Sequence, residues 1–279
     1  MLYRPSKQSL PTVRDSQSFR YVQHKRIHQD KMGLVLETDI GIEQISISNL
    51  QVLLVGPGCS ITSAAIRDLA DHNCTVVWMG EEGVRFYSCG LGATNSGKNA
   101  EHHARIWANP QEGQKVIQRM YSIRYGQDFP DITNMTLNEI RGHEGQRVKK
   151  AYAEQAKQQG VVWNGRSYNR GAWDATDAVN QALSATSACL YSLCHSVVLS
   201  VGFLPSLGFL HNDNARAFAI DIADMYRETV TIPIAFSLMA NTVPDVNGTM
   251  ARRACRDYFA KNNFLEKILK DTYFVLGVQ

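Results

Sequence analysis

The chain has 279 residues, of which 44% are hydrophobic and 20% charged, with a formal net charge of +3. This composition is typical of a globular protein with one large domain or two ordinary ones. No run of eighteen apolar residues occurs, and residues 1–19 have no apolar core, which argues against membrane insertion and secretion. The six cysteines form no C-x-x-C pair, so we expect free thiols in a cytoplasmic protein rather than a zinc site.

The first ninety residues are rich in short β patterns. Alternating or β-branched runs predict strands at 19–27, 33–37, 42–47, 52–55, 75–79 and 84–87, the last two as a hairpin. One stretch, 62–72, has helical spacing. Residues 91–99 are small and polar without periodicity and predict a linker. We therefore expect a β-rich domain over residues 1–90.

Beyond the linker the periodicity becomes helical. The predicted helices are 100–108, 111–125, 137–159, 174–201, 215–227, 230–240, 249–260 and 263–275. Between them, residues 161–168 (Val-Val-Trp-Asn-Gly-Arg-Ser-Tyr) predict a tight hairpin with Asn-Gly in a type I′ turn. The expected fold class is α+β, with a small N-terminal β-rich domain followed by a larger all-α-helical domain over residues 100–279.

The segment 141–150 (R-G-H-E-G-Q-R-V-K-K) places one carboxylate, Glu144, in a strongly basic predicted helix. One interpretation makes Glu144 an oxygen ligand of a divalent metal, while Arg141 and Arg147 neutralise phosphates around it. The alternative is a solvated helix face on which Glu144 is shared between those two arginines, each three residues away. Taken alone, the segment favours the alternative.

A second segment, 208–227, carries two carboxylates on an otherwise apolar predicted helix. Asp221 and Asp224 are three residues apart and share a face. Such a pair resists desolvation unless a cation lies between the two carboxylates. The alternative is that Asp221 caps a helix and Asp224 pairs with Arg227.

His211 lies on the loop that leads into this helix. By itself it is typical of a polar loop residue. With Glu144 and Asp224 it forms a set of one imidazole and two carboxylates from three separated places. Such a set suits Mg²⁺ or Mn²⁺ better than zinc.

Basic charge gathers in two windows of the second half. Residues 137–170 carry seven basic and three acidic side chains, and residues 252–270 carry six and two. Such clusters indicate an anionic polymer as partner, although solvated helices also produce them. In the predicted hairpin, Arg166 and Tyr168 could bind phosphates or stack on bases. A packed surface hairpin explains that segment equally well.

Several separated blocks resemble a known family. They are R-G-H-E-G-Q-R-V-K-K-A-Y, W-N-G-R-S-Y, G-F-L-H and D-I-A-D, with W-M-G-E-E-G-V-R-F-Y before them and A-C-R-D-Y-F after them. In this order they resemble the CRISPR-associated spacer-acquisition endonuclease/integrase family, in its subtype I-E (Cascade-type) form. The resemblance implies an N-terminal domain that forms a homodimer and a helical catalytic domain. It also implies a heterohexamer of two such dimers with a dimer of a small ferredoxin-like CRISPR-associated partner.

The resemblance also implies roles for individual residues. The implied metal ligands are Glu144, His211 and Asp224, with Asp221 close by and Tyr191 near the catalytic centre. Implied contacts with DNA come from Tyr21, Arg85, Arg227, Arg252, Arg253 and Arg256.

We therefore expect a metal-dependent DNA integrase that uses Mg²⁺ or Mn²⁺ to join the 3′-hydroxyl ends of a short captured duplex to the CRISPR repeat. A nuclease or branched-DNA resolvase would use the same ligands with water as nucleophile. A third possibility is a DNA-binding scaffold whose acidic residues are only structural, and this scaffold would have no catalytic activity.

Overall fold

The computed structural model describes residues 18–30, 33–38, 41–72, 74–80, 86–90, 97–126, 132, 135–167, 177–240 and 248–278. The chain is mixed α/β, with a strand-rich N-terminal part and a helical C-terminal part, as predicted. Its contacts form two compact units. The first comprises residues 1–101 with 196–203, and the second comprises residues 102–195 with 204–279.

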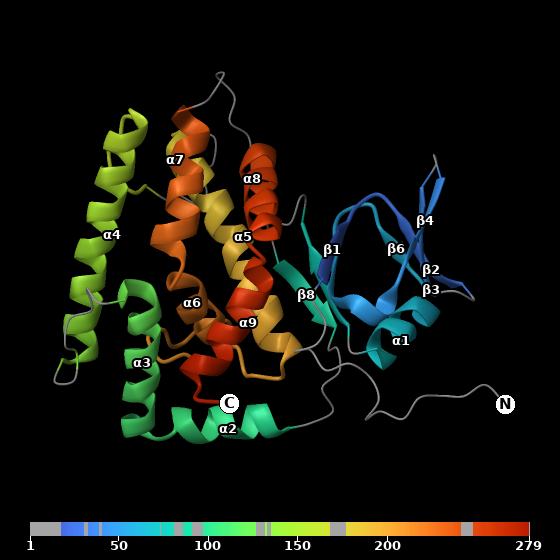
Figure 1. Cartoon of the computed structure of the whole chain (residues 1–279), viewed down its shortest axis with the longest axis horizontal. Coiled ribbons are helices and arrows are strands. Elements are labelled where there is room, and N and C mark those ends of the chain that lie inside the picture. Colours follow the sequence, from blue (N-terminus) through green and yellow to red (C-terminus); the bar gives the residue numbers. More distant parts are fainter. Residues whose placement is uncertain are drawn as a thin grey trace. The chain divides into compact units, whose positions relative to one another are not determined.

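The described strands of the first unit form two four-stranded sheets (Figure 1). One sheet has the order β1 (Ser18–Val22), β5 (Leu50–Val55), β7 (Thr75–Met79) and β8 (Phe86–Gly90). The other has the order β4 (Gly41–Ile45), β3 (Gly33–Thr38), β2 (Arg26–Asp30) and β6 (Ser60–Ile61). The pairing of β7 with β8 is antiparallel, which confirms the predicted pairing of these two segments.

The predicted strand 19–27 is wrong in one respect, because it is two strands that belong to different sheets. β1 ends at Val22 and β2 begins at Arg26. Between them His24 has a φ of 52°, and its backbone N–H donates to the carbonyl of Pro57 (2.9 Å). Helix α1 (Ser63–Asp71) packs on β2 and β7, and its Leu69 is fully buried.

The predicted helices beyond the linker are confirmed, with bounds that differ by a few residues. They are α2 (Lys98–Trp107), α3 (Pro110–Tyr125), α4 (Leu137–Gln159), α5 (Ala178–Ser200), α6 (Ala217–Asp224), α7 (Ile232–Ala240), α8 (Gly248–Lys261) and α9 (Phe264–Val275). One difference concerns the region between α6 and α7. A π-helical turn, Arg227–Thr231, joins the two helices there.

Helix α4 has both of its ends fixed by local sequence. The Thr136 side chain accepts from the Glu139 backbone N–H (3.3 Å), and the Glu139 carboxylate accepts from the Thr136 backbone N–H (2.7 Å). This capping box satisfies two donors that the first turn leaves unpaired. Gly160, with a φ of 65°, closes the other end in the left-handed conformation. These signals set the bounds of the helix that carries Glu144.

The predicted hairpin over 161–168 is wrong, because residues 161–167 form no strand; Tyr168 lies outside the described residues. The side chain of Asn180 on α5 donates to the carbonyl of Gly165 (3.0 Å) and accepts from the Ser167 backbone N–H (3.0 Å). One side chain therefore binds the backbone groups that a partner strand would have bound.

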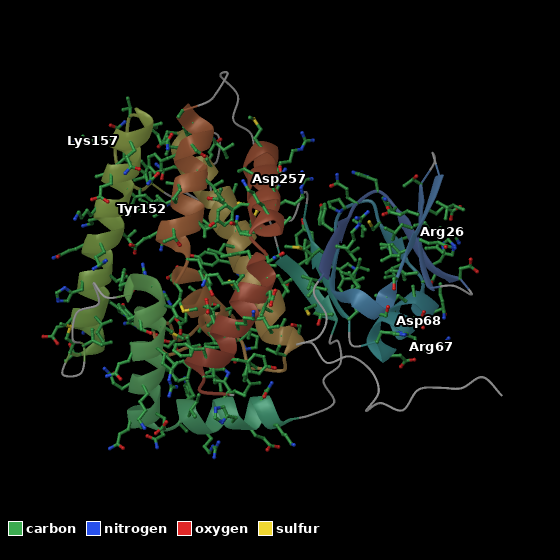
Figure 2. All side chains as sticks on the ribbon, viewed as in Figure 1. Arg26, Arg67, Asp68, Tyr152, Lys157 and Asp257 are labelled. Atoms are coloured by element: carbon green, nitrogen blue, oxygen red, sulfur yellow. The ribbon has the colours of Figure 1, made fainter. Side chains whose placement is uncertain are left out.

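The same segment contributes an aromatic side chain to the core between α4, α5 and α7. Trp163 lies against Tyr152 of α4 and Phe236 of α7, with ring centroids 4.9 and 5.4 Å away. Figure 2 shows Tyr152 on the side of α4 that faces α7. In the described part of the chain, α5 alone is long and apolar enough to cross a membrane. Most of it is buried inside the protein, as expected for a core helix.

Candidate metal centre

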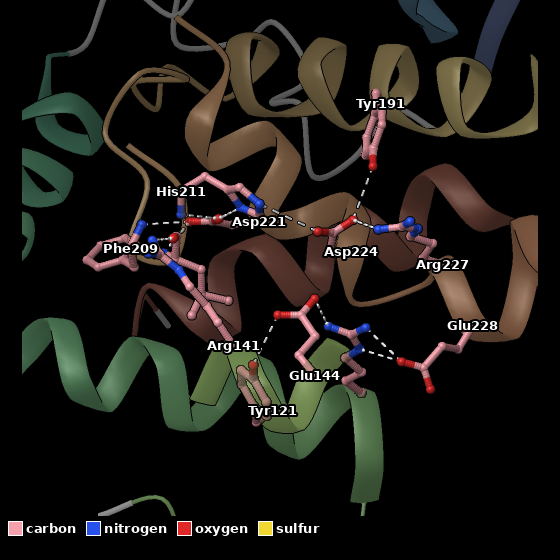
Figure 3. A network of polar contacts seen from close by, with 12 residues as sticks. Tyr121, Arg141, Glu144, Tyr191, Phe209, His211, Asp221, Asp224, Arg227 and Glu228 are labelled. Atoms are coloured by element: carbon pink, nitrogen blue, oxygen red, sulfur yellow. Dashed lines mark hydrogen bonds and ion pairs between the residues drawn. The ribbon is translucent and has the colours of Figure 1, made fainter. Parts of the chain in front are cut away.

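The loop before α6 folds back onto Asp221 (Figure 3). The Asp221 side chain is fully buried and accepts from the backbone N–H groups of Phe209 (2.6 Å), Leu210 (3.1 Å) and His211 (3.0 Å). Its Oδ1 also accepts from Nδ1 of His211 (2.7 Å). Each carboxylate oxygen thus has two donors, which fills the acceptor positions of Asp221. The alternative that Asp221 caps a helix is wrong, since α6 begins at Ala217.

The contact with Asp221 fixes how His211 presents its ring. Because Nδ1 donates to Asp221, Nε2 is left on the other side of the ring, 3.9 Å from Oδ2 of Asp224. A carboxylate that holds one ring nitrogen in this way is the usual support of a metal-binding histidine. The hydrogen bond with Asp221 also raises the pKa of His211, against the opposing effect of burial.

Asp224 is a second buried carboxylate of this region. Its side chain is 5% exposed, accepts from the hydroxyl of Tyr191 (3.3 Å) and lies 3.7 Å from the guanidinium of Arg227. Burial raises the pKa of Asp224, Arg227 opposes this effect, and the charge of Glu144 adds to it. The expected ion pair with Arg227 is therefore present, but it does not offset the desolvation of the carboxylate.

Glu144 is bound by α3 rather than by its neighbours on α4. Its Oε1 accepts from Arg124 (2.7 Å) and its Oε2 from the hydroxyl of Tyr121 (3.3 Å). The Glu144 side chain is 14% exposed. The solvated-face alternative is therefore wrong.

The two arginines that flank Glu144 contact other groups. Arg141 donates to the carbonyl of Leu210, next to His211, and so links α4 to the loop before α6. Arg147 lies over the ring of Tyr125, 3.9 Å from its centroid. Arg141 thus lies beside the candidate metal ligands, where it could neutralise an anionic substrate.

Three elements bring Glu144, His211 and Asp224 to one place (Figure 3), and the charge of Glu144 raises the pKa of both other groups. Within the described ranges, no three His, Cys, Asp or Glu side chains are already arranged to hold a metal ion. The donor set nevertheless fits a hard divalent cation. It offers two carboxylates and an imidazole whose other nitrogen is already held.

Three side chains of this centre, Tyr121, Arg124 and Glu228, were not predicted from the sequence. Tyr121 and Arg124 lie on α3, and Glu228 lies on the π-helical turn. A basic residue in the last turn of a helix is ordinarily explained by the helix dipole, so Arg124 gave no functional signal.

The other residues that were predicted to contact DNA lie in different parts of the chain. Arg166 donates to Asn180 (2.8 Å) and Ser184 (2.9 Å) of α5, which gives it a structural role. Arg252, Arg253 and Arg256 lie on α8, and Arg256 pairs with Asp257. The Tyr21 hydroxyl donates to Gln23 in the first unit (3.1 Å). Arg85 lies outside the described residues, as Tyr168 does.

His103 of α2 supports the loop that carries His211. It is fully buried, its Nε2 lies 2.9 Å from the carbonyl of Leu207, and its Nδ1 accepts from the Leu204 backbone N–H (3.2 Å). This pairing requires the neutral ring, with the proton on Nε2. Burial lowers the pKa of His103 from 6.5 to about 4.

His103 should make the protein less stable in mild acid. The unfolded chain binds a proton at His103 near pH 6.5, whereas the folded chain excludes it down to about pH 4. Stability therefore falls as the pH drops through this window, by about 2 kcal/mol between pH 7 and pH 5 for this group. Urea unfolding of the wild type and His103→Gln at both pH values measures the effect. Equal pH dependence of the two proteins would contradict it.

Comparison with known proteins shows the family to which this chain is similar. The family model described as CRISPR associated protein Cas1 matches residues 21–127 and 111–256. A CRISPR-associated endonuclease Cas1 of Thermus thermophilus is 40% identical over 94% of this chain and 80% of its own length. The CRISPR-associated endonuclease Cas1 of Escherichia coli is 32% identical over 92% of this chain and 84% of its own length.

Solved structures agree with these relatives. A structure described as a TtCas1–DNA complex has a TM-score of 0.79 and 39% identity, covering 96% of this chain and 99% of the other. A casposase bound to integration product has a TM-score of 0.66 at 15% identity, covering 93% of this chain and 90% of the other, and thus shares the fold. With a family match across most of its length and relatives at this level of identity, the chain belongs to the Cas1 family of CRISPR-associated endonucleases.

Proposed function

We propose that this enzyme is a metal-dependent integrase of CRISPR adaptation, which joins the 3′-hydroxyl ends of a short captured duplex to the CRISPR repeat by transesterification. The observation that carries the proposal is that Glu144, His211 and Asp224 come from three elements to one place (Figure 3), with Nε2 of His211 3.9 Å from Oδ2 of Asp224 and Nδ1 of that ring bound by Asp221. Two comparisons support it: a Cas1 relative was solved as a DNA complex, and a casposase with the same fold was solved with an integration product.

In this mechanism Glu144, His211 and Asp224 would hold Mg²⁺ or Mn²⁺. When bound, the ion would polarise the scissile phosphate and stabilise charge on the attacking and leaving oxygens. Asp221 would be a positioning residue in this mechanism rather than a metal ligand. Its oxygens already accept from three backbone N–H groups and from His211, so it fixes the orientation of the imidazole.

The residues around the ligands handle charge and position. The Arg227 side chain is 25% exposed beside Asp224, and it donates to the hydroxyl of Tyr152 (3.1 Å), which fixes its direction. It is therefore placed to bind a phosphate oxygen at the candidate centre. The hydroxyl of Tyr191 donates to Asp224 and so limits the orientations of that carboxylate. Arg141 adds a second cation next to the His211 loop.

The finer assignments from the sequence remain part of this proposal. Double-stranded DNA would be both the captured and the target substrate, with phosphates bound by the basic residues of 137–170 and 252–270. The β-rich N-terminal domain would form the homodimer. Two dimers would assemble with a dimer of the small ferredoxin-like partner, in the subtype I-E manner.

A strand-transfer assay tests the proposed function. The full-length protein, with and without the small partner, is incubated with a short duplex, a supercoiled plasmid that carries the repeat, and Mn²⁺ or Mg²⁺. Covalently joined products are expected, and they should disappear with EDTA and with a duplex whose 3′ ends are dideoxy. Nicking that persists with dideoxy ends would favour hydrolysis. DNA binding that EDTA leaves unchanged, with no joining or nicking, would favour a scaffold.

A further inference from the structure

A buried cation lies between two carboxylates beside the candidate metal centre. The Arg124 side chain is 3% exposed. Its NH1 donates to Oε1 of Glu144 (2.7 Å), while its Nε (3.1 Å) and NH2 (2.7 Å) both donate to Oε1 of Glu228. The two-point contact is with Glu228, so the guanidinium is anchored there and presents its NH1 to Glu144.

Glu228 reaches Arg124 from an unusual part of the backbone. It is the second residue of the π-helical turn Arg227–Thr231, which follows the helix that carries Asp224. π-Helical turns are rare and often occur at functional sites. Here two consecutive side chains contact different partners of the centre: Arg227 lies beside Asp224, and Glu228 binds Arg124. The hydroxyl of Tyr125 also donates to Glu228 (3.3 Å).

We propose that Arg124 and Glu228 are positioning residues, which hold Glu144 in the orientation that binds the divalent cation. This inference rests on the proposed function, because it concerns the same metal site. Neither residue needs to touch the cation or the DNA. They act through Glu144, whose side chain comes from a different helix than Asp224.

The geometry favours positioning over competition between Arg124 and the cation. A cationic side chain that competes with the metal ion would bind both oxygens of the Glu144 carboxylate. Arg124 instead makes one hydrogen bond to Glu144, from NH1 to Oε1. Among the described residues, the hydrogen-bond donor to Oε2 of Glu144 is a neutral group, the Tyr121 hydroxyl. Glu228 shares the charge of Arg124, which weakens its hold on Glu144 electrostatically while fixing it in space. A long, flexible glutamate is therefore ordered before a ligand arrives, which lowers the entropic cost of binding.

Titration with Mn²⁺ in the absence of DNA tests the inference, with free Mn²⁺ measured by electron paramagnetic resonance. The variants are Arg124→Lys, Glu228→Ala and Glu228→Gln, with the wild type and Glu144→Ala in the same series. We expect the Kd for Mn²⁺ to rise about 10- to 100-fold in Arg124→Lys and Glu228→Ala, as for other residues that support metal ligands. Glu228→Gln retains an acceptor oxygen and should fall between Glu228→Ala and the wild type.

Asp271→Asn is the matched control, because Asp271 also accepts from a tyrosine (Tyr226, 2.7 Å) and a cation (Lys267, 2.7 Å) at similar exposure. It should lower stability without changing the Kd for Mn²⁺. Thermal melting establishes that each variant is folded, and if Arg124→Lys does not fold, the Glu228 variants decide. Unchanged or tighter Mn²⁺ binding in folded variants overturns the inference alone. Equal Mn²⁺ binding by Glu144→Ala and the wild type overturns the proposed metal site and this inference with it.

Discussion

Replacing Asp224 by asparagine should reduce strand joining by on the order of 100-fold or more, while it makes the metal-free protein more stable. The loss of strand joining follows from the removal of an anionic ligand of the proposed metal site. The gain follows from burial, since the Asp224 side chain is 5% exposed and its pKa is raised by desolvation and by Glu144. Asparagine keeps an oxygen that can accept from Tyr191. It also removes a charge that burial disfavours in the folded state.

The size of this stability gain should depend on pH. Because the pKa of Asp224 is raised in the folded state, its ionised form destabilises the wild type above that pKa. The stability advantage of Asp224→Asn should therefore be largest near neutral pH. It should shrink as the pH falls through the raised pKa toward the ordinary value of 3.8, below which both states of the wild type are mostly protonated.

Mn²⁺ should reverse the order of stability. A ligand that binds only the folded state stabilises it by about 2.7 kcal/mol at a concentration of 100 times its Kd. The wild type should gain this stabilisation, and Asp224→Asn should gain much less. Thermal melting with EDTA measures the stability of each metal-free protein, and thermal melting with saturating Mn²⁺ measures how much the ion stabilises it. A variant that is less stable than the wild type with EDTA, or that gains as much from Mn²⁺, would contradict the assigned role of Asp224.

The helical part of the fold could be predicted because its signals are local. The capping box of Thr136 and Glu139 and the closing Gly160 lie within or beside α4, and so its bounds follow from the sequence. The hairpin predicted over 161–168 failed for the opposite reason. Asn-Gly is a strong local turn signal, but the partner of this backbone is Asn180, whose approach depends on the packing of α5.

The candidate site, too, could be predicted from the sequence only in part. Burying an acidic side chain is costly unless a partner compensates its charge, so two acidic residues on an apolar helix indicate a functional site. This signal is visible in the sequence around Asp221 and Asp224. The distinction between them is not visible, because it depends on which carboxylate the loop at Phe209–His211 folds onto. Arg124 and Glu228 gave no signal, since their significance arises only when α3 and the π-helical turn meet at Glu144.

Replacing Asp221 by asparagine should have the opposite effect on stability to the same change at Asp224, three residues further along α6. In the wild type each carboxylate oxygen of Asp221 accepts from two donors. Asparagine replaces one of these oxygens by an amide nitrogen, which cannot accept a hydrogen bond, so two donors lose their acceptor. Each buried donor left unpaired costs about 1–3 kcal/mol, which predicts a loss of about 4 kcal/mol. The thermal midpoint should fall by on the order of 10 °C, with or without Mn²⁺.

Asp221→Asn should also weaken Mn²⁺ binding about 10- to 100-fold, because the His211 ring loses the carboxylate that fixes its orientation. The two asparagine variants remove the same charge from the same helix, so each is the matched control of the other. If Asp221 were itself a ligand with spare acceptor positions, both variants would gain stability with EDTA. A destabilised Asp221→Asn beside a stabilised Asp224→Asn is expected only if one carboxylate holds the loop and the other awaits a cation.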